Sequence, residues 1–126
     1  MNAGAAVFGR LTGQTTAGSR VYPLVLPQQP TYPAVTYQQI SAVRLHEMGQ
    51  DAGVIRVRVQ VNAWGKTYAE ARTLAGEVET RLSRFRGVVG GVTVLDVVLD
   101  NEVDMAYESE TQSRRVTQDY TLFINA

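Results

Sequence analysis

Hydrophobic and polar residues alternate most regularly between Val54 and Trp64. One side of this stretch carries arginine, glutamine and asparagine, and the other side carries Ile55, Val57, Val59, Val61 and Ala63. A period of two predicts a strand with one polar and one buried face. Residues 34–40, rich in β-branched and aromatic side chains, predict a second strand. We expect the two strands to form a hairpin joined by residues 41–53, where the alternation stops.

The period changes to three and four residues between Thr67 and Arg86, as is typical of an amphipathic helix. Thr67 and Glu70 have the spacing of a capping box, in which each side chain bonds the other residue's backbone N–H, so the helix should begin here. Gly87 is expected to end it. The apolar positions along the helix are Tyr68, Ala71, Leu74, Ala75, Val78, Leu82 and Phe85.

Two more strands are predicted in the C-terminal third, beyond a pair of glycines at 90 and 91. The strand over residues 92–103 would turn one face inward, with Leu95, Val97, Leu99 and Val103. The strand over residues 113–124 would bury Val116, Tyr120, Leu122 and Ile124. The acidic stretch 104–111 between them is expected to be a turn or a long loop.

The N-terminal third has weaker patterns. Residues 3–12 predict a short helix, although Gly4 and Gly9 disfavour it. Residues 13–33 contain all four prolines, which predicts an extended segment lying over the domain. Its expected apolar anchors are Val21, Tyr22, Leu24 and Val25.

Together these elements predict one α+β domain spanning residues 1–126. We expect a four-stranded antiparallel or mixed sheet, with the elements in the order αββαββ and with one long and one short helix on one face. A chain of 126 residues is long enough to bury a core without disulfides or structural metals.

Composition excludes several classes of protein. The chain has no cysteine, which removes disulfides and thiolate-bound metals. Twelve Lys and Arg balance twelve Asp and Glu, and this neutrality argues against a general binder of nucleic acid or anionic membranes. No apolar run approaches the length of a membrane span, and the first residues lack the features of a signal peptide. We therefore expect a soluble protein with no membrane partner.

The order and spacing of five short segments resemble a family of phage tail-completion, or tail-terminator, proteins found in long-tailed phages, prophages and gene transfer agents. The segments are residues 18–23 (GSRVYP), 33–38 (PAVTYQ), 58–65 (RVQVNAWG), 67–71 (TYAEA) and 115–122 (RVTQDYTL). The resemblance covers the chain from about Leu11 to Phe123, except that the N-terminal helix here is short and contains glycine. It implies a subunit that assembles in the host cytoplasm as a hexameric ring at the head-proximal end of the virion tail.

Such a ring sits on the tail tube protein, stops tube growth and meets a head connector or stopper protein, while DNA passes through its centre without sequence-specific binding. The resemblance implies neither an enzyme nor a cofactor. Within the same class, a capsid-side connector or adaptor protein is the main alternative. A small enzyme or metal-binding module built on the acidic stretch, and a nucleic-acid-binding adaptor, are weaker alternatives.

The segment 44–51 is the candidate docking loop for the tail tube or the connector. It carries two apolar residues that no periodic element would bury, and apolar loop tips suit contacts that order on binding. The alternative is a solvated loop whose Leu45 folds back onto the sheet. The candidate residues are Arg44, Leu45, His46, Glu47, Met48, Gln50 and Asp51.

His46 is the only histidine, and the sequence gives it neither a catalytic partner nor a second metal ligand at suitable spacing. We interpret it as an exposed loop residue. No catalytic, cofactor-binding or metal site is therefore predicted.

An acidic group runs from Asp96 to Glu110 with no basic residue between. In a regular strand, the acids from 96 to 104 would share one face, and a carboxylate-lined channel would repel DNA phosphates. The alternatives are a solvated face, ion pairs with Arg56, Arg58, Arg114 or Arg115, and a divalent cation site. The candidate channel-lining residues are Asp100, Glu102, Asp104, Glu108 and Glu110.

The second face of the predicted sheet is polar but carries scattered apolar residues, which suggests that it is partly covered. Contact between subunits of a ring would cover it, through Arg56, Arg58, Trp64, Val94 and Val98. Cover by the chain's own segment 13–33 is the alternative.

Overall fold

A computed structural model describes residues 3–47, 50–105 and 113–125. Two helices and six strands follow one another along the chain. They are α1 (Ala3–Leu11), β1 (Val21–Pro23), β2 (Ala34–Glu47), β3 (Gln50–Gly65), α2 (Tyr68–Leu82), β4 (Gly87–Val89), β5 (Val92–Asp104) and β6 (Arg114–Asn125).

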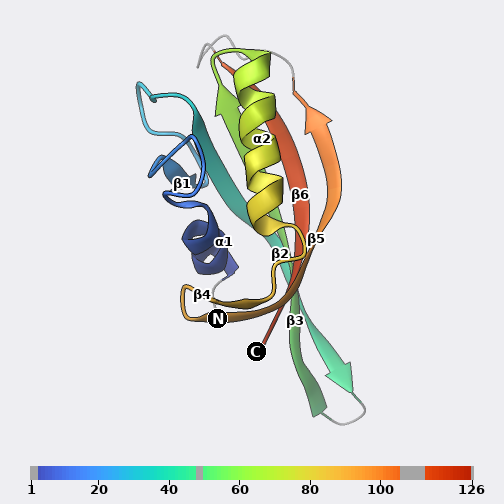
Figure 1. The fold of residues 1–126 in the computed structure, drawn as a ribbon. Coiled ribbons are helices and arrows are strands. Elements are labelled where there is room, and N and C mark those ends of the chain that lie inside the picture. The colour runs from blue at the N-terminus through green and yellow to red at the C-terminus, as the bar shows by residue number, and fades with distance from the viewer. Residues whose placement is uncertain (1–2, 48–49, 106–112, 126) are drawn as a thin grey trace.

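The six strands form one curled, mixed sheet in the order β1-β2-β3-β6-β5-β4 (Figure 1). Only β1 and β2 are parallel, and every other neighbouring pair is antiparallel. The predicted four-stranded sheet with element order αββαββ is therefore wrong. The two strands missed by the prediction, β1 and β4, have three residues each. Three residues are too few for an alternating pattern, and Pro23 argued against a strand.

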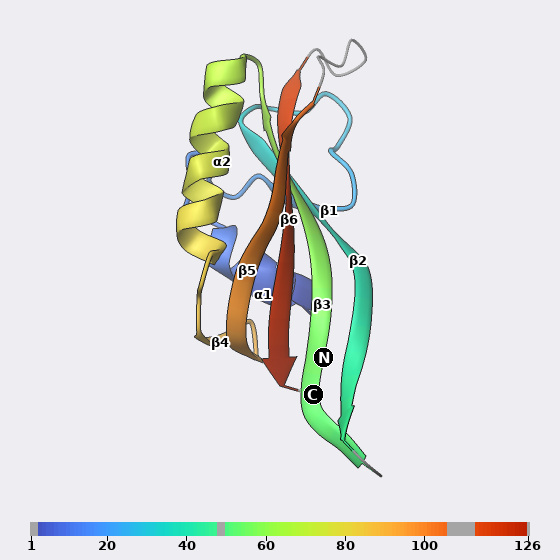
Figure 2. The same cartoon turned by 90° about the vertical axis from the view of Figure 1, so that its right-hand side faces the viewer.

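Both helices lie on the same side of the sheet, as Figure 2 shows. The inward side chains of β3 are those predicted, and they pack beneath α2 with Leu74, Val78 and Leu82, all at most 1% exposed. Val7 and Leu11 of α1 extend the same core. One contiguous core thus joins both helices to the concave face of the sheet.

The capping residues predicted for the long helix are confirmed in part. The backbone N–H of Glu70 donates to Thr67 Oγ1 at 3.1 Å. The Glu70 carboxylate accepts from the N–H of Lys66, one residue before the position that the capping box predicts. The helix ends at Leu82, before Gly87, because Arg84 takes a positive φ of 60° and turns the chain toward β5.

The hairpin of β2 and β3 is much longer than predicted. The expectation of a loop over residues 41–53 is wrong, because β2 runs to Glu47 and β3 starts at Gln50. From Gln38 to Arg44 both faces of β2 are exposed, so hydrophobic and polar residues do not alternate in this part of the sequence. We call residues 40–55 the arm, and Figure 1 shows it projecting beyond the body of the domain.

Strand β5 has two register irregularities, at Leu95 and at Asp100. Each bulge adds a residue and exchanges the faces that follow it. Leu95, predicted to face inward, is 38% exposed, while Val92, Val94 and Val97 are buried. The predicted inward face is therefore wrong at Leu95, before the first bulge is passed, and again at Val103, which lies beyond the second bulge, pairs with Thr117 and is 43% exposed.

The segment 13–33 wraps one edge of the sheet. Val21 is buried in β1 as predicted, but Leu24 and Val25 are 64% and 73% exposed, so their role as anchors is wrong. Leu24 has a positive φ of 68°, which directs the chain to the convex side of the sheet (Figure 2). Neither described helix is long and apolar enough to cross a membrane.

Candidate assembly surfaces

The arm carries the start of the predicted docking segment. Arg44 lies on β2 opposite Ile55 and is exposed. The backbones of Leu45, His46, Glu47, Gln50 and Asp51 belong to the two strands near the turn, and Met48 lies outside the described residues. Nearer the body, Ile40 and Val43 are 47% and 44% exposed. Val43 was missed because it fell in the stretch 41–53 assigned to the loop, and Ile40 was the last residue of the predicted strand 34–40.

The acidic residues of β5 do not share one face, which corrects the expectation of a single acidic stripe. The bulge at Asp100 separates them. Asp100 accepts a hydrogen bond from the Thr121 hydroxyl, on the convex face. Glu102 and Asp104 instead face α2, where Arg72 Nη1 lies 2.8 Å and 3.4 Å from their carboxylate oxygens. Glu108 and Glu110 lie outside the described residues.

Asp96 forms a separate ion-pair group at the edge of the sheet. Its carboxylate lies 3.0 Å from Arg84 Nη1 and 3.9 Å from Arg86 Nε. Arg84 and Arg86, which follow the end of α2, thus hold the chain against β5. The ion-pair partners found for the acids of β5 come from α2 and the residues just after it.

Glu102 ends a chain of hydrogen bonds that reaches into the core. Gln118 Nε2 donates to Glu102 Oε2 at 2.7 Å and to the Ala75 carbonyl at 3.1 Å. The Tyr120 hydroxyl donates to Gln118 Oε1 at 2.8 Å. The bond from Gln118, followed by the bond from Arg72, lowers the pKa of Glu102. Burial raises the pKa of Tyr120, so its phenol stays neutral. This arrangement ties α2 to the sheet.

The convex face carries part of the predicted subunit-subunit set. Arg56 and Arg58 are exposed on β3, and Val98 is half-buried on β5. Val94 points the other way and is 2% exposed in the core. Trp64 is 7% exposed within this chain, and its Nε1 donates to Thr36 Oγ1 at 2.9 Å.

A groove of about 330 Å³ lies beside Trp64 on the convex face. Leu24, Val25 and Pro27 form one wall, and the amide side chains of Gln38 and Gln60 belong to its lining. The segment 13–33 therefore covers part of this face, and the lower part around Arg56 and Arg58 stays open.

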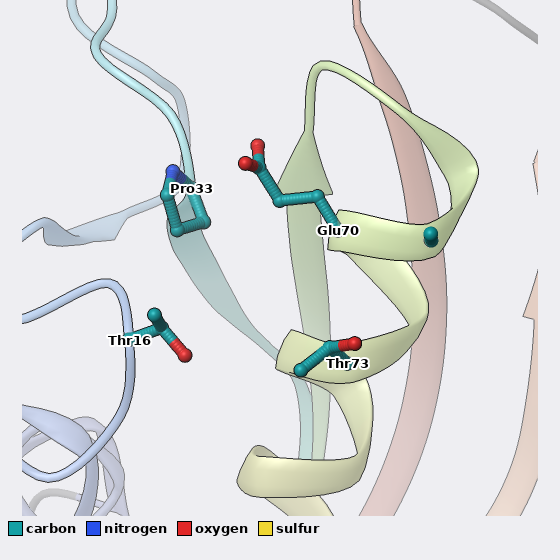
Figure 3. A pocket seen from close by; sticks show the side chains of 5 residues that line it. Thr16, Pro33, Glu70 and Thr73 are labelled. Atoms are coloured by element: carbon teal, nitrogen blue, oxygen red, sulfur yellow. The ribbon is translucent and has the colours of Figure 1, made fainter.

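A second hollow, of about 280 Å³, lies between the first turns of α2 and the N-terminal segment. Figure 3 shows Thr16 and Pro33 facing Glu70 and Thr73 across it. The Glu70 carboxylate already accepts a hydrogen bond from the backbone N–H of Lys66. The backbone N–H of Thr16 donates to the carboxylate of Glu77, farther along α2. Within the described ranges, no three His, Cys, Asp or Glu side chains are grouped closely enough to hold a metal ion.

Comparison with known proteins places the chain in a family. The family model described as tail completion protein gp17 matches residues 5–125. The chain belongs to this tail completion family. It is a structural component of the tail of a phage-type virion, and the family resemblance found in the sequence is confirmed.

A solved structure supports the fold assignment of this tail completion protein. A chain from the virion of a native gene transfer agent particle superposes with a TM-score of 0.71 at 16% sequence identity. The match covers 97% of the present chain and 93% of the other. No curated protein sequence matches the chain.

Proposed function

We propose that this tail completion protein forms a ring on the last layer of the tail tube. The ring ends tube polymerisation and joins the tail to the head connector, and DNA passes through its centre. The protein acts without catalysis. The observation that carries this proposal is the arm, a two-stranded projection on which the apolar Ile40 and Val43 are 47% and 44% exposed.

A subunit of a closed ring needs two different, complementary surfaces, because cyclic assembly uses heterologous contacts. The chain offers different surfaces at the two ends of its sheet. The arm side has exposed apolar residues and exposed arginines, whereas the opposite end carries the acids of β5. The lower convex face around Arg56, Arg58 and Val98 is the proposed contact between subunits, together with the exposed rim beside Trp64.

The end of the arm is the proposed docking element for the tail tube or the connector, with residues 44–47 and 50–51 on its two strands. A β-hairpin holds its tip at a fixed distance from the body, so the tip can reach an adjoining ring. Apolar residues at the base of the arm add area to the contact between subunits.

DNA passage requires a channel wall that does not retain phosphates. The balanced charge of the chain satisfies this, because strong binding to DNA needs a surplus of cations. Asp100 remains the proposed channel-lining acid among the described residues, since it is exposed and makes no ion pair with a described residue. Glu102 and Asp104 are neutralised in part by Arg72, so their share of the repulsion is smaller.

The proposal is tested by deleting the gene and imaging the particles by negative-stain electron microscopy. A terminator predicts over-long tails and unjoined heads, and restoring the gene restores tail length. Tails of normal length that fail to join heads indicate a capsid-side connector instead. Normal, joined particles contradict both functions.

Variants of the arm give a finer test. Val43→Asp puts a charge on the proposed contact and is expected to leave the subunit folded but unable to restore joined particles. Val88→Asp is the matched control, because Val88 is a 71% exposed valine on β4, away from the arm. Equal complementation by the two variants would remove the arm from the proposal.

A further inference from the structure

The sheet has an unpaired edge at each end. Strand β1 pairs with β2 only as far as Tyr37. The last hydrogen bond at this edge is the one that the N–H of Leu24 donates to the Tyr37 carbonyl. Strand β4 covers β5 only as far as Val94, and the N–H of Arg84 bonds the Val97 carbonyl. Beyond these points no described strand pairs with the outer edge of either strand. The open edges are residues 38–47 of β2 and residues 98–104 of β5.

Edge strands in soluble proteins are normally protected by short length, proline, lysine or a covering element. Strands β1 and β4 follow this rule, since each has three residues and β1 ends in Pro23. The open edge of β2 has no proline and no lysine, and Ile40 and Val43 are exposed along it. Its register with β3 shifts at Ile40 and between Arg44 and His46, which leaves residues 41–44 as the regular part of the edge. An uncovered edge of this length is suited to pairing with another strand.

The two edges fit one another in charge. Among residues 38–44 of β2 the single charged residue is Arg44, whereas Glu47 lies farther along the same edge. Arg56 and Arg58 lie beside this segment on β3, and all three arginines are exposed. The open part of β5 carries Asp100, Glu102 and Asp104 and no cation. Opposite charges on two edges favour pairing between unlike edges and disfavour pairing of an edge with itself.

The two edges also fit in register. Ser41 and Val43 of β2 share the convex face, because they pair with Arg58 and Arg56 of β3. Asn101 and Val98 of β5 share that face too, since they pair with Asp119 and Thr121 of β6. An antiparallel ladder with Ser41 opposite Asn101 brings Val43 opposite Val98, because the bulge at Asp100 keeps both pairs on the convex face. The apolar Val43 then covers an apolar partner.

We propose that residues 38–44 of β2 in one subunit pair antiparallel with residues 98–103 of β5 in the next subunit, so that one continuous sheet runs from copy to copy. This inference rests on the proposed ring and names the contact that closes it. It assigns the uncovered edge of the arm to a second copy of this chain, and Val98 to the interface.

The short edge strands limit where the partner can lie. Within one subunit, Asn101 is level with Gln38, through Asp119 and Gln60. Pairing Asn101 with Ser41 of the neighbour shifts the partner three residues, or about 10 Å, along the strands. Strands that tilt relative to the axis of a closed assembly produce such a stagger. Strand β1 of one copy and β4 of the next then lie at opposite ends of the new ladder and do not compete with it.

Paired cysteines test this contact directly, since the chain contains no cysteine of its own. The variant Ser41→Cys, Asn101→Cys is introduced into whole particles, which are oxidised and analysed on denaturing gels. Opposed Cα atoms in an antiparallel ladder are about 4.5–5.5 Å apart, within the range of a disulfide. We expect reductant-sensitive bands at multiples of the 13.8 kDa subunit. The matched control is Ser41→Cys, Thr80→Cys, because Thr80 is exposed on α2, away from both edges.

The second variant, Val43→Cys, Val98→Cys, should give the same bands. It tests the contact independently, in case the substitutions at Ser41 and Asn101 disturb the strands locally. Assembled, joined particles without bands from either pair overturn the pairing and leave the proposed ring standing. Dimers from Ser41→Cys alone also overturn it, because they require like edges to meet. Bands from the pairs together with normal particles after gene deletion would keep the pairing and refute the proposed function.

Discussion

Gln118 joins three polar groups in and beside the core, and removal of these contacts should destabilise the fold. Its side chain is 1% exposed and joins the Tyr120 hydroxyl, the Ala75 carbonyl and the Glu102 carboxylate. The variant Gln118→Leu keeps similar volume but removes all three bonds. Tyr120, fully buried, then holds a hydroxyl with no other described partner.

The expected loss follows from these contacts. A buried polar group without a partner costs about 1–3 kcal/mol, and a hydrogen bond to a charged group contributes about 1.5–3 kcal/mol. The Glu102 side chain is 28% exposed, so water replaces part of its lost bond. We therefore expect Gln118→Leu to lower the free energy of unfolding by about 3 kcal/mol, a large part of the total for a small domain.

Urea unfolding followed by the fluorescence of the single, buried Trp64 measures this loss. A double-mutant cycle with Tyr120→Phe isolates the bond between the two side chains. Because Phe has no hydroxyl to leave unpaired, the double variant should lose at least about 1 kcal/mol less than the sum of the single variants. A loss below about 0.5 kcal/mol for Gln118→Leu, or additive single losses, would refute the reasoning.

Three further predictions concern the fold. Gly90→Ala should destabilise the protein by about 1–3 kcal/mol more than Gly91→Ala in urea unfolding, because both glycines have positive φ but only at Gly90 would a Cβ meet a backbone carbonyl, at 2.6 Å. Leu74→Ala should cost about 2–5 kcal/mol by cavity formation, and a value near zero would contradict the placement of α2. The lowered pKa of Glu102 stabilises the fold above the ordinary carboxyl pKa of 4.5, and this contribution is lost as pH falls through the lowered value. The urea midpoint of the wild type should therefore fall more steeply below pH 4.5 than that of Glu102→Gln, and parallel curves would remove the Glu102 contribution.

The sequence predicted those elements in which one face is buried and the other exposed. The alternation in β3 and the three- and four-residue spacing in α2 arise because each element buries only one face against the core. Strand β6 was predicted for the same reason, with Tyr120 and Leu122 inward as found. The pattern failed where this physical cause was absent.

Three failures show this. The arm is exposed on both faces of β2, so no alternation marks its strands. The bulges at Leu95 and Asp100 exchange the faces of β5, and a strict period of two therefore assigned its acids to one face. Strands β1 and β4 are held by pairing with longer neighbours, a tertiary effect that a three-residue sequence does not reveal.

The candidate site was predictable only in outline. The family resemblance and the segment around Arg44 came from the sequence, whereas the pairing of Arg72 with Glu102 joins residues 30 positions apart and needed the structure. The interface role of Val98 was a prediction of the sequence and stays one. Its proposed partner, Val43, emerged only when the strand was seen to continue past residue 40.

The central claim is that copies of this chain close a ring at the junction of head and tail. Electron cryomicroscopy of intact particles, with density traced at that junction, tests it most directly. The account predicts one ring of this subunit on the last tube layer, with the arms contacting an adjoining ring and an open channel at the centre. Density for the chain elsewhere in the particle, or as isolated copies without a ring, would contradict it.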